Sequence, residues 1–210
     1  MASASEHKAI NLGHVQLIRK AILFAFIVLG VAFVLVGDAR WPSGSFVHEQ
    51  IEFVGLILIV DCICGRIYCT LYIGGRKIES LVTTGPYSVT RNPLYLFSII
   101  GAIGAGAQLG SFVLAFATGF LACLVFLLVI FKEEAVLATR FSETFAEYMA
   151  VPRLWPRLSL WQDSASVQVN PRLVRTTALD ASVFLLSIPI AEGFEYLHEI
   201  GWLPTLLTLP

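Results

Sequence analysis

Charged residues are scarce in this chain. Only 14% of its 210 residues are Asp, Glu, Lys or Arg, whereas about a quarter is typical of soluble domains. Hydrophobic residues make up 57% of the chain, and the mean hydropathy is +0.78. With a net charge of -1 the chain has no excess of basic residues, so we expect no nucleic-acid partner. The composition instead predicts an integral membrane protein surrounded by membrane lipids.

Histidine and cysteine are also few, and their positions argue against a metal centre. The four cysteines all lie in apolar segments, and the spacing Cys62-x-Cys64 is not one that metal sites use. We interpret them as small apolar packing residues. The four histidines are scattered along the chain: His7, His14, His48 and His198. We therefore expect no bound metal.

Long hydrophobic runs, by contrast, are present. A helix that crosses a membrane needs about 20 mostly apolar residues. Such runs occur at residues 18–36, 46–65, 94–131 and 178–194. The third is long enough for two spans, with a turn at the polar residues 108–111, and Pro189 interrupts the last. The sequence thus predicts a single all-α domain over residues 1–210, a polytopic transmembrane helix bundle of about five spans. No small-residue cleavage site follows the first run, which we expect to stay as an anchor.

The basic residues predict the orientation of these spans. If the N-terminus is cytoplasmic, 13 of the 14 Lys and Arg residues fall on the cytoplasmic side, and only Arg40 lies outside. The reverse orientation would violate the positive-inside rule for all 13. We therefore expect a multi-pass protein whose N-terminus and two polar segments, residues 66–92 and 132–175, are cytoplasmic.

Two carboxylates lie inside the second predicted span. Ionisable groups within a span are functional candidates by default. Glu52 and Asp61 are nine positions apart and so face opposite sides of a helix. We expect Glu52 to reach the headgroups and Asp61 to pair with Arg66, which leaves open whether Asp61 has a functional role.

The polar segments carry most of the unusual residues. In the first, Arg91-Asn92 precedes a proline suited to the first turn of the third span. The second begins with Glu133-Glu134, and its apolar residues then recur every three or four positions, which predicts a cytoplasmic amphipathic helix over residues 133–150. Because the third and fourth spans form a hairpin, its two open ends must be neighbours. Arg91 and Asn92 should therefore lie beside the two glutamates at one membrane face.

Together these segments resemble the membrane methyltransferases that include isoprenylcysteine carboxyl methyltransferases and phospholipid N-methyltransferases. The family pattern TxGPYxxxR(H/N)PxY matches residues 83–95. A Glu-Glu pair, helically spaced Leu, Phe and Tyr residues and a final Val-Pro-Arg match residues 133–153, so the resemblance covers a core of about residues 80–157. It implies an S-adenosylmethionine site lined by seven residues: Tyr87, Arg91, Asn92, Pro93, Tyr95, Glu133 and Glu134.

The resemblance also implies catalytic roles for Arg91, Glu134 and Arg153. Methyl transfer from a sulfonium depends mainly on orientation. An arginine can bind the carboxylate of the cofactor and a glutamate its ammonium group. Arg153 would orient a carboxylate acceptor, whereas an ammonium acceptor would need a base such as Glu134 or Asp61. We therefore expect a methyltransferase that acts on a lipophilic or lipid-linked acceptor, either a phospholipid amine or an isoprenylcysteine-like carboxylate.

Other interpretations stay open. Asn92 stands where prenylcysteine enzymes generally have His, which resembles the phospholipid branch more closely. The chain could also be a non-catalytic membrane scaffold with a vestigial cofactor site. A third alternative is a short relative of the NADPH-dependent sterol reductases, which are usually longer and should carry more basic residues for the 2′-phosphate.

Overall fold

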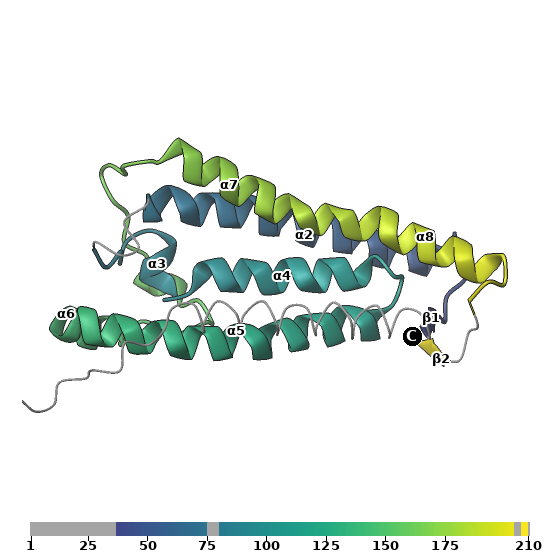
Figure 1. Cartoon of the computed structure of the whole chain (residues 1–210), viewed down its shortest axis with the longest axis horizontal. Coiled ribbons are helices and arrows are strands. Elements are labelled where there is room, and N and C mark those ends of the chain that lie inside the picture. The colour runs from purple at the N-terminus through teal and green to yellow at the C-terminus, as the bar shows by residue number, and fades with distance from the viewer. Residues whose placement is uncertain (1–36, 75–79, 204–206, 210) are drawn as a thin grey trace, which may run out of the picture.

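The fold is a bundle of long helices, seen in a computed structural model that describes residues 37–74, 80–203 and 207–209. Figure 1 shows α4 (Pro93–Ala107) lying between α2 (Phe46–Ile73) and α5 (Phe112–Arg140). A C-terminal helical segment runs along α2 and consists of α7 (Pro171–Ser182), η2 (Val183–Leu186) and α8 (Ser187–Glu199). The short elements are α3 (Pro86–Val89), α6 (Ser142–Tyr148), η1 (Leu158–Leu160) and a parallel pair of strands, β1 (Gly37–Ala39) and β2 (Leu207–Leu209).

The predicted helical membrane protein is confirmed. Three helical stretches are long and apolar enough to cross a membrane, namely α2, α5 and residues 171–199. The third predicted span corresponds to the shorter apolar helix α4. The span predicted at residues 18–36 lies outside the described residues. One face of α5 carries large apolar side chains that the protein leaves exposed, as expected for contact with lipid: Phe112, Phe116, Phe120, Leu124, Leu128 and Phe131.

Close packing of α2 against α4 depends on glycine. A Cβ atom added to Gly55 would lie 2.8 Å from the carbonyl oxygen of Gly104, and one added to Gly104 would lie 2.6 Å from that of Gly55. Neither distance is possible for real carbon atoms, so the two backbones approach as only small residues allow, a common arrangement in membrane helix pairs. This contact holds α4 in the centre of the bundle.

The helical hairpin forms where the polar break predicts it. α4 ends at Ala107, and α5 begins after Ser111, whose hydroxyl accepts a hydrogen bond from the Leu114 amide. The prediction of one amphipathic helix over residues 133–150 is wrong. α5 continues to Arg140, and a break at Phe141 (φ -123°, ψ 41°) separates it from α6. The apolar stripe is real, but the non-helical backbone at Phe141 divides it between two helices.

The last predicted span is longer than residues 178–194. Asn170 caps α7, its side chain accepting hydrogen bonds from the amides of Arg172 and Leu173, so helical structure begins earlier. It passes through the 3₁₀ turn η2 before α8. Pro189 explains this turn, since a proline has no N–H with which to reach the carbonyl four residues back.

The motifs lie at the end of the bundle where α2 and α5 are longer than α4. At 1.5 Å per residue, α4 is about 22 Å long, whereas α2 and α5 are both about 40 Å. Both neighbours therefore extend beyond the N-terminus of α4. As Figure 1 shows, α3 and α6 lie at this end, beside the start of α4. The polar motifs are thus gathered beyond the first residue of α4.

The orientation of the bundle in the membrane stays a prediction from the distribution of basic residues. A reporter enzyme fused at residue 80 should remain cytoplasmic, and one fused at residue 43 should be exported, because α2 separates the two points. Paired alkaline phosphatase and fluorescent-protein fusions measure this directly. An exported reporter at residue 80 would reverse the topology.

Candidate functional site

The two motif segments, far apart in the sequence, are joined by backbone hydrogen bonds. The Arg91 amide donates to the Pro152 carbonyl (2.9 Å), and the Arg157 amide donates to the Val89 carbonyl (2.9 Å). The buried Thr90 hydroxyl lies 3.2 and 3.1 Å from the carbonyl oxygens of Arg153 and Leu154. The loop after α6 therefore pairs with the residues before α4, which confirms that these segments are neighbours.

A nearly buried carboxylate lies at the centre of this contact. Glu134, near the end of α5, accepts from Nε of Arg91 on one oxygen and from Nε of Arg153 on the other, both at 3.0 Å. The side chain of Glu134 is only 11% exposed and that of Arg91 only 8%. The Asn92 side-chain amide adds a longer contact of 3.4 Å to the same carboxylate. Charges this buried need such pairing, because each has lost most of its hydration.

The same side chains also hold the loop backbone. Nη1 of Arg91 donates to the carbonyl oxygens of Met149 and Val151, both at 2.8 Å, and the Asn92 amide donates to that of Arg153 at 3.0 Å. Most of the donor capacity of Arg91 is therefore used within the protein. The geometry favours positioning roles for Glu134 and Arg153, which link α5 to the loop.

Two buried tyrosines complete the framework. The Tyr148 hydroxyl donates to the Tyr87 carbonyl oxygen at 2.7 Å. Burial raises the pKa of both phenols above the usual range, so both hydroxyls stay protonated. The Tyr87 hydroxyl is buried and has no hydrogen-bond partner among the described residues. An unsatisfied buried donor is costly, and it marks a place where a ligand can supply the acceptor.

A pocket opens at this point. It is a shallow pocket that is partly open to solvent. Ile73 at the end of α2 and residues 80–82 also line the pocket. They were not among the predicted site residues, although residues 80–82 directly precede the first motif. Six of the seven predicted cofactor residues line the pocket: Tyr87, Arg91, Asn92, Pro93, Tyr95 and Glu133. The seventh, Glu134, is not part of the lining.

The lining suits S-adenosylmethionine, whose methionine end is zwitterionic. The Glu133 carboxylate can accept from an ammonium group, and the Tyr87 hydroxyl and the Arg91 guanidinium can donate to a carboxylate. Leu94, Tyr95 and other apolar side chains in the wall can contact the less polar remainder of the cofactor. The residues present therefore fit the cofactor that the motifs imply.

The surroundings of the two carboxylates of α2 were not fully predicted. The predicted ion pair between Asp61 and Arg66 is wrong: Arg66 donates instead to the Ser98 hydroxyl on α4, and Asp61 is exposed on α2. Glu52 lies 3.3 Å from Nε2 of His48, and its contact with the headgroups stays a prediction. Neither carboxylate lines the pocket.

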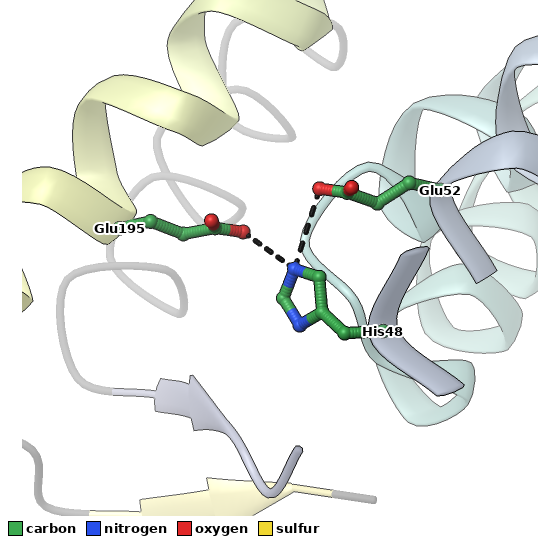
Figure 2. Close-up of side chains that lie close together, drawn as sticks. All are labelled: His48, Glu52 and Glu195. Carbon is green, nitrogen blue, oxygen red and sulfur yellow. Dashed lines mark hydrogen bonds and ion pairs between the residues drawn. The ribbon is translucent and has the colours of Figure 1, made fainter. Parts of the chain in front are cut away.

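A second polar cluster, not predicted from the sequence, lies at the other end of α2. It consists of His48, Glu52 and Glu195 (Figure 2). The scattered histidines of the sequence did not indicate it, because Glu195 on α8 is 147 residues from His48. The one local signal was Glu52, four residues after His48 and so on the same helix face.

Comparisons with known proteins agree with the geometry. A family model described as phospholipid methyltransferase matches residues 53–144. The cobalt-zinc-cadmium resistance protein CzcN of Cupriavidus metallidurans is 34% identical over 180 residues, which cover 85% of this chain and 82% of that protein. The nickel-cobalt-cadmium resistance protein NccN of Alcaligenes xylosoxydans xylosoxydans is 33% identical over 177 residues, covering 84% and 82%. No solved structure matches the chain.

Proposed function

The chain belongs to the phospholipid methyltransferase family, and we propose that it is an integral membrane methyltransferase that uses S-adenosylmethionine. The observation that carries the proposal is the pocket at the end of α4. Six motif residues line it, and among them the Tyr87 hydroxyl has no hydrogen-bond partner in the described part of the chain. The proposal is supported by the family match over residues 53–144 and by a pocket whose lining comes mostly from that range.

The protein's contribution to such a reaction is orientation. S-adenosylmethionine, when bound, supplies an electrophilic methyl group on a sulfonium. Glu133 would bind the ammonium group of the cofactor, and the Tyr87 hydroxyl would donate to its carboxylate. Glu134, Arg91 and Arg153 keep the pocket wall rigid, since together they join α5 to the loop after α6. Holding the donor in one pose is the main way in which a protein accelerates group transfer of this kind.

We propose a lipophilic or lipid-linked acceptor, because the pocket lies at the end of a membrane bundle and has Ile73, Leu94 and Leu137 in its wall. The family match and Asn92 favour an amine headgroup over a prenylcysteine carboxylate. Two relatives are named as metal-resistance proteins. The acceptor should therefore be sought in lipid extracts of cells grown with and without excess cobalt, zinc, cadmium or nickel.

The test is binding of S-adenosylhomocysteine to the detergent-purified protein, measured by calorimetry. Saturable binding supports the methyltransferase. If the well-folded wild type does not bind, the scaffold alternative is favoured, and NADPH is the next ligand to measure. Arg91→Ala is a poor control here, because it would break the pairing with Glu134 and release the loop.

Tyr87→Phe is the better probe of the pocket. Because the hydroxyl has no partner among the described residues, its removal should leave the melting temperature unchanged. Affinity for S-adenosylhomocysteine should fall about 10- to 100-fold, the effect of one hydrogen bond to a charged carboxylate. Tyr196→Phe, at an exposed position on α8, serves as control. A lower melting temperature with unchanged affinity would assign the hydroxyl a structural role instead.

A further inference from the structure

The cluster at the opposite end of the bundle is built around a fixed imidazole. His48, in the first turn of α2, is only 2% exposed. Gly110, in the hairpin turn, lies against its ring: the backbone there has φ +62°, and an added Cβ would lie 2.1 Å from the ring. A side chain at this position would displace the histidine, so the turn and the ring are matched to one another.

Hydrogen bonding determines which nitrogen of His48 faces the glutamates. Nδ1 lies 3.1 Å from the carbonyl oxygen of Trp41. A carbonyl only accepts, so Nδ1 carries the hydrogen and donates it. Nε2 lies 2.9 Å from Oε1 of Glu195 and 3.3 Å from Oε1 of Glu52 (Figure 2). A neutral imidazole would direct its lone pair at two carboxylates. This point therefore requires either a proton, on the ring or on one of the carboxyl groups, or a cation shared by all three groups.

We propose that His48, Glu52 and Glu195 bind a divalent transition-metal ion of the Zn²⁺ type. Their ligand atoms all lie within 4.8 Å of one another. Zinc bonds to nitrogen and oxygen are about 2.0–2.2 Å long, so ligand atoms around a tetrahedral ion lie roughly 3.3 Å apart. The two distances from Nε2, 2.9 and 3.3 Å, are close to this value.

The contacts around the ligands support this assignment. A metal-bound histidine usually donates its other N–H to a carbonyl or carboxylate, as Nδ1 does here to Trp41. One imidazole and two carboxylates suit zinc, cobalt or nickel, and three protein ligands leave a fourth position for water. Zinc also balances the charge of two carboxylates beside a neutral ring.

The position of the site indicates what the metal does. In the C-terminal helical segment, residues 171–199, only Ala181 and Ala191 are buried. A metal ion held by His48 and Glu52 of α2 and by Glu195 of α8 would tie the loosely packed end of this segment to the bundle. The site lies at the opposite end of α2 from the pocket, so it is independent of the proposed cofactor site.

Zinc titration of the purified protein, after treatment with a chelator, tests this site. We expect one Zn²⁺ per chain by calorimetry and a higher melting temperature with zinc bound. Glu52→Gln and Glu195→Gln should each lower the affinity about 100-fold or more, since changes to groups that merely orient a ligand already cost about 10- to 100-fold. Glu49→Gln, at the exposed residue next to His48, should bind zinc like the wild type.

Two outcomes overturn the proposal. A folded wild type without saturable zinc binding would show that the cluster is only an ion pair around a protonated histidine. Unchanged affinity in both glutamine variants would place the zinc elsewhere. Should either variant fold poorly, the visible spectrum of Co²⁺ added to the wild type still decides, because a tetrahedral site gives intense ligand-field bands and octahedral surface binding gives only weak ones.

Discussion

Replacing Glu134 with alanine should lower the free energy of unfolding by about 3 kcal/mol or more, the usual cost of removing one partner from a buried ion pair. Its carboxylate pairs with Arg91 on one oxygen and Arg153 on the other, and Arg91 is almost fully buried. The variant would leave the Arg91 guanidinium charged and uncompensated. Thermal or urea unfolding in detergent measures the loss.

The comparison requires two companion variants. Glu134→Gln keeps the volume but removes the charge, and it should recover only part of the lost stability. Glu147→Ala, at an exposed position on α6, should unfold like the wild type. If Glu134→Ala were as stable as Glu147→Ala, the carboxylate would not hold the loop, and a direct role in ligand binding would become the better interpretation.

Glu133→Gln should cause a large loss of ligand affinity. Glu133 lines the pocket, unlike its neighbour. A hydrogen bond to a charged group contributes about 1.5–3 kcal/mol, so affinity for S-adenosylhomocysteine should fall about 10- to 100-fold. Calorimetry on the purified variant gives the affinity, and a melting curve of the same sample gives the stability.

Glu143→Gln is the matched control for this change, since Glu143 is exposed in the first turn of α6. It should bind S-adenosylhomocysteine with the affinity of the wild type. Affinity that is unchanged in Glu133→Gln as well would remove Glu133 from the proposed cofactor site. Binding of S-adenosylhomocysteine to the wild type is measured first and decides whether the cofactor binds at all. Unchanged affinity in Glu133→Gln would then exclude only this residue from the site.

Helix geometry explains why two adjacent carboxylates have different environments. Successive residues of an α-helix point about 100° apart. On α5, this rotation directs Glu134 toward Arg91 and Arg153, while Glu133 lines the pocket. The family pattern treats the Glu-Glu pair as one motif, but the pair combines a structural ion-pair partner with a pocket residue.

The pattern of apolar and polar residues was sufficient to predict the helix bundle. Hydrophobic length predicted α2, α5 and the C-terminal helical segment, and the break at residues 108–111 predicted the hairpin. This works because lipid forces each crossing segment to satisfy its backbone hydrogen bonds internally, which leaves helices as the local solution. The hairpin in turn brings Arg91 beside Glu134, so the location of the pocket also followed from the pattern.

The partners of individual polar side chains depended on packing between segments. Arg66 bonds to Ser98 instead of Asp61, and Glu52 lies beside a histidine. The cluster of His48 and Glu195 exists only because α8 returns along α2 to its first turn. Hydropathy records how deep a residue lies in the membrane, but not the rotation of its helix or the identity of the neighbouring helix, and these determine which charges meet.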